Sequence, residues 1–292
     1  IKEGSYLHKD CWTISPEIEW DEYVTNPFAG EKTVIFVSDI DTLEFSVVPN
    51  KQYDFVVVLN GKRAYTRIST DVSKSPSNPF LEYTHDDKNR VALVDTIPFR
   101  LGDNHGIYIS GKINGSEAFD LLFDTGANAL VISSRLVGEK VTMTMDGQQE
   151  NNGSDGNHTV ETSSGNKLEV GQLNWENVSL LSIDYSYLNG VVGWVVFENK
   201  IVEIDYDLNL LLIHRSMETV PTGYTKIETK MINNIPYVWG TLIVGNKTCS
   251  NWMEYDTGSN GNLLLSRKFA RANRLHKSLE FTGMSHLSGS AG

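Results

Sequence analysis

Two stretches of the sequence place an aspartate in the same local setting. Each consists of an apolar or aromatic run, the triplet Asp-Thr-Gly, a small residue, an asparagine and a second apolar run. The stretches span residues 119–132 and 251–264. The triplets with their small residues are Asp124-Thr125-Gly126-Ala127 and Asp256-Thr257-Gly258-Ser259. The repetition of the whole setting, and not only of the triplet, indicates two copies of one structural unit.

An aspartate at the end of a buried strand, followed by Thr and Gly, is expected on a tight turn whose backbone amides face the carboxylate. Two such turns related by a local twofold axis would bring Asp124 and Asp256 within hydrogen-bonding distance. Carboxylates that close cannot both ionise, so the pair shares one proton. One aspartate can then activate a water as a general base while the other, protonated, polarises a carbonyl. The threonine hydroxyls can lock the turns together, and Gly126 and Gly258 allow a tight turn and close approach of a substrate.

The alternative interpretation is that these are ordinary turns, because aspartate and glycine are common in hairpin loops. Two Asp-Thr-Gly triplets, each in the same strand–turn–strand setting, arise rarely by chance. The sequence therefore favours a two-carboxylate site.

The elements that must position the two aspartates are strands. Short β-branched and aromatic runs predict strands along the whole chain. They span residues 33–37, 43–48, 53–59, 106–110, 118–123, 130–132, 177–183 and 201–206. Asn60-Gly61 predicts a two-residue hairpin, which suggests an antiparallel, sandwich-like domain at the start of the chain. The fold class expected is all-β.

Two other segments lack the strand signal. Residues 146–166 are polar and glycine-rich, and the alternating flanks at 141–145 and 159–162 predict a projecting loop on a hairpin. Residues 266–279 predict a helix with an apolar stripe and a cationic face. That helix is expected to be solvated at the surface, with a docking function as the alternative.

Composition excludes several classes of function. The 292 residues include 37 acidic and 25 basic side chains, a net charge of −12, which argues against nucleic acid as a partner. No apolar run approaches the roughly 20 residues of a membrane helix. The histidines have neither the spacing nor the cysteine companions of a metal site, so neither metal nor cofactor is expected. Cys11 and Cys249 can form at most one bridge.

The two Asp-Thr-Gly units resemble the active-site signature of aspartic peptidases of the pepsin and retropepsin kind. A third element, Asn189-Gly190-Val191-Val192-Gly193-Trp194, is similar to the hydrophobic–hydrophobic–Gly element of that family. The layout is similar to bacterial retropepsin-like proteins with an N-terminal β domain before two peptidase units. The resemblance covers about residues 97–292.

The resemblance implies a bilobal β fold, pseudo-dimeric within one chain, with a cleft between its lobes for a polypeptide substrate. It implies Asp124 and Asp256 as the catalytic pair, and Thr125 and Thr257 as bridges between the turns. The hairpin at 141–165 would be a flap over the substrate, although the loop at its tip has no aromatic residue. Ala127 and Ser259 would contact the substrate, and Gly126 and Gly258 would support the turns.

The expected domains are residues 1–95, an accessory β domain; 96–217, the first peptidase lobe; and 218–292, a truncated second lobe. The first unit continues for about 60 residues beyond the point that matches residue 292. Within these residues the second lobe is expected to lack counterparts of the flap and of the hydrophobic–Gly element. Three explanations stay open: the natural protein continues, this form is truncated or processed, or another chain supplies the missing strands. Association through this incomplete lobe is one expected consequence.

The leading functional hypothesis is an aspartic endopeptidase acting through an activated water. The alternatives are a catalytically inactive aspartic-peptidase-like binding protein and an extracytoplasmic β-rich adhesin or carbohydrate-binding protein. Binding alone gives no reason to hold two carboxylates together, because their repulsion costs stability. The family resemblance and the surface composition favour a secreted or periplasmic location; residues 1–292 contain no predicted signal peptide, as expected of a mature form.

Overall fold

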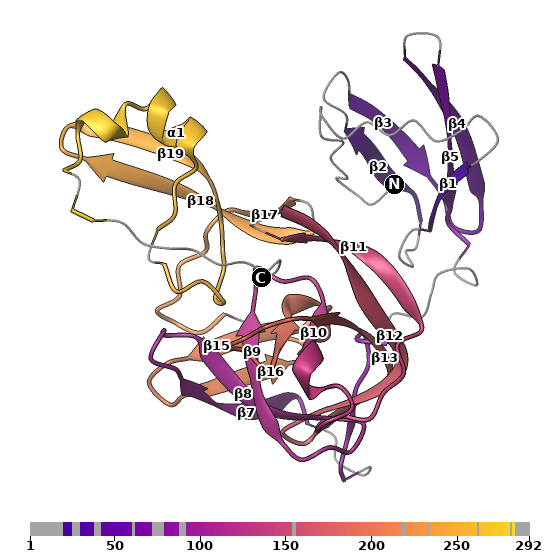
Figure 1. Ribbon diagram of the computed structural model, residues 1–292. Coiled ribbons are helices and arrows are strands. Elements are labelled where there is room, and N and C mark those ends of the chain that lie inside the picture. The colour runs from indigo at the N-terminus through magenta and orange to yellow at the C-terminus, as the bar shows by residue number, and fades with distance from the viewer. Residues whose placement is uncertain are drawn as a thin grey trace. The chain divides into compact units, whose positions relative to one another are not determined.

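The computed structural model describes most of the chain as β-structure (Figure 1). The described residues are 20–24, 30–37, 42–59, 62–71, 79–87, 92–153, 156–217, 220–232, 234–261, 263–280 and 282–283. The chain divides into two compact units, one of residues 1–78 with 231–234 and one of residues 79–230 with 235–292. The prediction of an all-β fold is confirmed.

The first unit contains two small sheets. One has the strand order β1-β5-β4, and the other pairs β2 with β3. The strands are β1 (Trp20–Val24), β2 (Lys32–Val37), β3 (Thr42–Val47), β4 (Gln52–Leu59) and β5 (Lys62–Ser69). The β4–β5 and β2–β3 pairs are antiparallel as expected, but β1 runs parallel to β5. The predicted turn at Asn60-Gly61 lies outside the described residues.

The second unit is built on a large, mostly antiparallel sheet with the order β11-β12-β13-β10-β14-β9-β8-β7-β16-β15. Its strands are β7 (Val94–Leu101), β8 (Ile107–Ile113), β9 (Phe119–Asp124), β10 (Leu130–Ser133), β11 (Gly147–Gly153), β12 (Gly156–Val170), β13 (Leu173–Ile183), β14 (Gly190–Gly193), β15 (Ile201–Asp205) and β16 (Leu210–His214). A short strand, β6 (Thr84–His85), pairs with β13. The predicted strands at 106–110, 118–123, 130–132, 177–183 and 201–206 all fall within this sheet.

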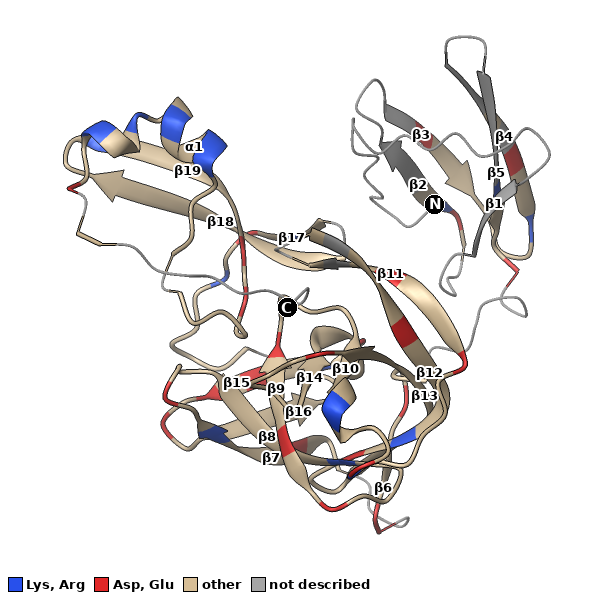
Figure 2. Ribbon diagram, viewed as in Figure 1, with Lys and Arg blue, Asp and Glu red and all other residues tan. Residues whose placement is uncertain are grey.

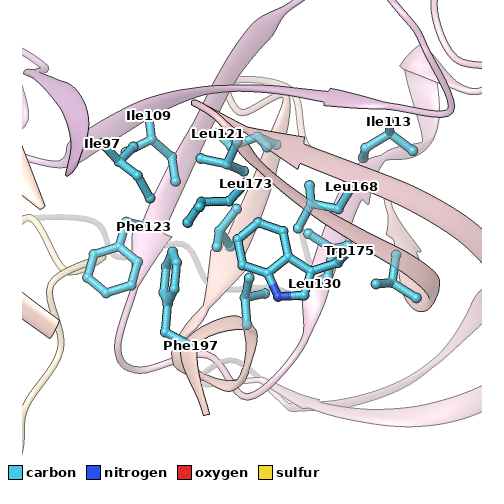
Figure 3. Packing of buried hydrophobic residues seen from close by; sticks show 14 of the residues in the cluster. Ile97, Ile109, Ile113, Leu121, Phe123, Leu130, Leu168, Leu173, Trp175 and Phe197 are labelled. Carbon is cyan, nitrogen blue, oxygen red and sulfur yellow. The ribbon is translucent and has the colours of Figure 1, made fainter. Parts of the chain in front are cut away.

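The core of this unit follows from alternating burial along the strands. In β7 and β8, buried residues alternate with more exposed ones, as expected for strands with one face toward a core. Aromatic rings pack at the centre of that core (Figure 3): the Phe197 ring lies 5.8 Å from Phe123 and 5.9 Å from Trp175, each pair edge to face. This packing places β9, which ends at Asp124, on a rigid support.

Strand β14 is the hydrophobic–Gly element of the sequence. It lies between β9, to which it runs parallel, and β10, to which it runs antiparallel. In this register Val191 pairs with Leu122, and Gly193 pairs with Asp124. The element therefore lies directly beside the first Asp-Thr-Gly turn.

The polar segment at 146–166 folds differently from the expectation. Its residues form the strands of a hairpin, in which Gly147 of β11 pairs with Thr162 of β12 and Gly153 pairs with Gly156. The predicted flank at 141–145 is not the hairpin strand. These polar residues show no apolar alternation and are held extended by pairing with β12. The sequence pattern, which depends on that alternation, therefore misplaced the strand by about six residues.

A three-stranded sheet, β17-β18-β19, precedes the second Asp-Thr-Gly turn. Its strands are β17 (Thr229–Ile232), β18 (Ile235–Val244) and β19 (Lys247–Glu254). The described residues after β19 contain only helical elements, α1 (Arg267–Ala272) and the 3-10 turn Leu275–Lys277. Figure 2 shows the basic residues gathered on α1.

The predicted helix at 266–279 is shorter than expected. Ser266 caps α1 by accepting a hydrogen bond from the Phe269 amide at 3.2 Å. Arg274 adopts a left-handed φ of 53°, which ends the helical run. Within the described part of the chain, no helix is long and apolar enough to cross a membrane.

Candidate active site

The two Asp-Thr-Gly turns each follow an antiparallel hairpin. The β8–β9 hairpin leads directly into Asp124, and the β18–β19 hairpin leads into Asp256 two residues after its last strand residue. The second ladder continues past β19, because the Tyr255 amide donates to the Pro236 carbonyl at 2.9 Å. The two aspartates thus follow equivalent hairpins.

The two threonines connect the turns by a reciprocal set of hydrogen bonds. The Thr125 amide donates to Thr257 Oγ1 (3.1 Å), and the Thr257 amide donates to Thr125 Oγ1 (3.0 Å). Each hydroxyl then donates to a carbonyl of the opposite strand. Thr125 Oγ1 donates to the Tyr255 carbonyl (2.6 Å), and Thr257 Oγ1 donates to the Phe123 carbonyl (3.0 Å). This exchange relates the turns by a local twofold axis.

The glycines of both triplets lie against the opposite carboxyl group. A Cβ atom placed on Gly126 would lie 2.8 Å from the Asp256 carboxyl carbon, and one placed on Gly258 would collide with the Asp124 carboxyl. Any side chain at either position would push the partner turn away. The two carboxyl groups therefore face each other across a pair of glycines.

The backbone amides of the turns point at the carboxylates. Asp124 Oδ1 accepts from the Gly126 amide at 2.7 Å. Asp256 Oδ1 accepts from two amides, those of Gly258 at 2.8 Å and Ser259 at 3.0 Å. Because N–H donors stabilise a carboxylate, Asp256 has the more favourable environment for the negative charge.

Burial raises the pKa of Asp124 to about 7, and the charge of Asp256 and a hydrogen bond with it act in the same direction. The Gly126 amide opposes this rise. A carboxyl group that keeps its proton close to neutral pH, beside a second carboxyl group, is the electrostatic arrangement expected of a pair that shares one proton.

A third carboxyl group, which the sequence analysis did not single out, lies near the pair. Glu254 Oε2 accepts a hydrogen bond from the Tyr237 hydroxyl at 3.3 Å. Partial desolvation of its carboxyl group, followed by the charge of Asp256, raises the pKa of Glu254 although its side chain is exposed. Alignment of the two repeats would have revealed it, because the equivalent residue of the first repeat is Leu122.

The small residues after the triplets have different surroundings. Ala127 packs against an apolar cluster that includes Leu122 and Val191, and its carbonyl accepts from the Trp194 amide at 3.0 Å. Ser259 Oγ accepts from the Gly261 amide at 3.2 Å within its own turn. The contacts of both residues support the turns, and their contact with a substrate stays a prediction.

The described residues contain no group of three His, Cys, Asp or Glu side chains that could hold a metal ion. Cys249 is buried and forms no disulfide, and Cys11 lies outside the described residues.

The paired Asp-Thr-Gly turns thus bring two carboxyl groups together on a β-rich scaffold. Residues 109–196 match the family model for aspartyl proteases, which confirms the predicted resemblance. The matched segment contains the Asp124 turn and β14, and it ends before Asp256. No curated protein matches the chain.

Proposed function

We propose that the chain is an aspartic endopeptidase that hydrolyses peptide bonds with a water activated between Asp124 and Asp256. The observation that carries this proposal is the reciprocal hydrogen bonding of Thr125 and Thr257, because it brings the two aspartates face to face. The aspartyl protease match of residues 109–196 supports a protease-type function in general.

In this proposal the two aspartates have different protonation states. Asp256 accepts hydrogen bonds from two backbone amides and carries the negative charge, so it takes a proton from the attacking water. Asp124, with a pKa raised to about 7, keeps its proton and donates a hydrogen bond to the scissile carbonyl. The water oxygen bonds to the carbonyl carbon. The proton taken up by Asp256 then passes to the amide nitrogen, and the C–N bond breaks to give an amine and a carboxyl group.

We further propose that the β11–β12 hairpin covers the bound peptide, and that Ala127 and Ser259 lie beside it. The same proposal includes a pseudo-dimeric arrangement of the lobes and an extracytoplasmic location. It also divides the chain into three parts, residues 1–95, 96–217 and 218–292. The exposed ring of Trp239 and the exposed Ile243 on β18 favour association through the second lobe, since exposed apolar surface commonly marks an interaction site.

The test is cleavage of a broad peptide library by the wild-type chain between pH 3 and 8. We expect Asp124→Asn, Asp256→Asn and a transition-state-mimicking aspartic peptidase inhibitor each to abolish cleavage. Asp184→Asn, an exposed aspartate at the end of β13, is the matched control and is expected to retain activity. Cleavage that survives both active-site substitutions would contradict the proposal.

A further inference from the structure

The local twofold axis makes the surroundings of the two aspartates directly comparable. Because the hydroxyls of Thr125 and Thr257 bind the carbonyls of Tyr255 and Phe123, those two carbonyl residues are equivalent. The residues immediately before them, Leu122 and Glu254, are then equivalent as well. Each lies two positions before an aspartate in extended backbone, where side chains at i and i+2 share a face.

The two equivalent positions have opposite chemistry. Leu122 is 4% exposed and packs in an apolar cluster with Val191 and Ala127. Glu254 is exposed, and its carboxyl group is held by the Tyr237 hydroxyl, which faces it across the β18–β19 ladder. A peptide that lies across the two aspartates therefore meets an exposed carboxylate beside Asp256, whereas the equivalent position beside Asp124 is buried in the core.

Within the residues that the structure describes, the carboxylate of Glu254 has no cationic partner. Among the described residues, no Lys or Arg side chain forms an ion pair with it, whereas Asp54 and Asp120 each pair with an arginine. The Tyr237 hydroxyl contacts only one of its two oxygens. In the described part of the chain, the titratable groups that interact with Glu254 are Tyr237, Asp256 and Asp124, and none of them supplies positive charge. A cationic ligand would complete this environment.

We propose that Glu254 determines specificity by binding a lysine or arginine side chain next to the scissile bond of the substrate. This inference rests on the proposed peptidase function, because the peptide must lie across Asp124 and Asp256. The preference should weaken in acid, because Glu254 has a raised pKa and loses its charge as the pH falls.

Binding of fluorescent peptides to the full chain tests the inference without requiring turnover. Asp124→Asn prevents cleavage, and matched peptides differ only in carrying lysine or norleucine at one position. We expect the lysine peptide to bind about 2- to 5-fold more tightly at low ionic strength, as for an exposed ion pair. Glu254→Gln introduced into the Asp124→Asn chain should remove this preference. Glu176 is an exposed glutamate on β13, and Glu176→Gln in the same background should keep the preference.

Charge reversal provides a second variant. Glu254→Lys should shift the preference toward a peptide with glutamate at the same position, a result that a purely structural role would not produce. The inference is overturned if Glu254→Gln keeps the lysine preference or if the chain with Glu254 intact shows none.

Cleavage by the chain with native Asp124 separates the inference from the proposed function. Hydrolysis without any charge preference supports the peptidase and overturns the role of Glu254. A Glu254-dependent lysine preference in binding, with no hydrolysis of any peptide, supports the role of Glu254 and overturns the peptidase.

Discussion

The threonine hydroxyls at the site are both acceptors and donors, and this double role is why threonine occupies the position. Thr257 Oγ1 accepts from the Thr125 amide and donates to the Phe123 carbonyl. Valine has the same shape but can do neither. Removing one hydroxyl therefore leaves two half-buried backbone groups of the opposite turn without partners.

Thr257→Val is expected to destabilise the chain by about 1–3 kcal/mol, the usual cost of leaving buried polar groups unsatisfied. Cleavage should fall with it, because the turn that carries Asp256 loses its anchor. Denaturant unfolding and peptide cleavage measure the two effects. Thr257→Ser keeps the hydroxyl and should retain most of the stability and most of the cleavage activity. A valine variant as stable and as active as wild type would refute the anchoring role.

The raised pKa of Asp124 links stability to pH. An unfolded aspartate titrates near 3.8, whereas folding raises the pKa of Asp124 to about 7, so the folded chain binds more protons between these values. The contribution of this group to stability is therefore complete below about pH 4 and is lost as the pH rises through 7. Asp124→Asn should lack this dependence.

Thermal unfolding of both chains from pH 4 to 8 checks this expectation. Relative to wild type, Asp124→Asn should gain stability as the pH increases. A stability difference between the two chains that stays constant from pH 4 to 8 would contradict this linkage. In the proposed function, cleavage should decline above about pH 7, since the shared proton is then lost.

At the scale of elements, β14 supports the first turn through a glycine that cannot be replaced. A Cβ atom on Gly193 would lie 2.5 Å from the carbonyl oxygens of both Ala127 and Ala129, and these are backbone atoms with little freedom to move. The Gly193 amide also donates to the Ala129 carbonyl at 3.0 Å. The close approach of these strands keeps the Asp124 turn in place.

Gly193→Ala is expected to cost about 1–3 kcal/mol of stability, as for other overpacked interiors, and to reduce cleavage. Gly283→Ala is the control, because no atom of the described residues lies within 4 Å of a Cβ atom placed there. Denaturant unfolding of the two variants compares them directly. Equal stabilities would show that the strands tolerate the added methyl group.

Elements with a strong local signal were predictable from the sequence, and those held by their partners were not. Apolar runs such as the one that ends at Asp124 identified their strands, and the repeated triplet identified the aspartates that the structure brings together. The strand β11 carries only polar residues and glycine, so its extended form depends on pairing with β12. Glu254 was not predicted because a single glutamate in a strand looks like a surface residue. Its significance depends on the fold, which brings Asp124, 130 positions earlier in the chain, close to Asp256 and Glu254.

At the scale of the whole molecule, a buried polar cluster fastens the start of the second unit. Asp95 is 2% exposed and accepts hydrogen bonds from Tyr83 at 2.7 Å and from the His85 ring at 2.8 Å. The short strand β6 pairs His85 with Leu173 of β13. The segment before residue 96 thus contributes buried contacts to the sheet that carries Asp124.

A chain of residues 79–292 is therefore expected to unfold cooperatively with a midpoint close to that of the same unit in the full chain. A chain of residues 96–292, which starts at the predicted lobe boundary, lacks Tyr83, His85 and Asp95 and should unfold at a lower temperature. Differential scanning calorimetry compares the two. Equal midpoints would show that the cluster contributes nothing and would favour the boundary after residue 95.

The hydrogen bonds that join the two turns link residues 130 to 134 positions apart in the chain. Contacts this distant in sequence form late, because the intervening chain must be ordered first. During synthesis at about 5–20 residues per second, the first turn emerges on the order of ten seconds before the second. A nascent chain holds one aspartate without its partner throughout that interval. In the proposed function, cleavage therefore begins only after the second Asp-Thr-Gly turn has formed its hydrogen bonds with the first.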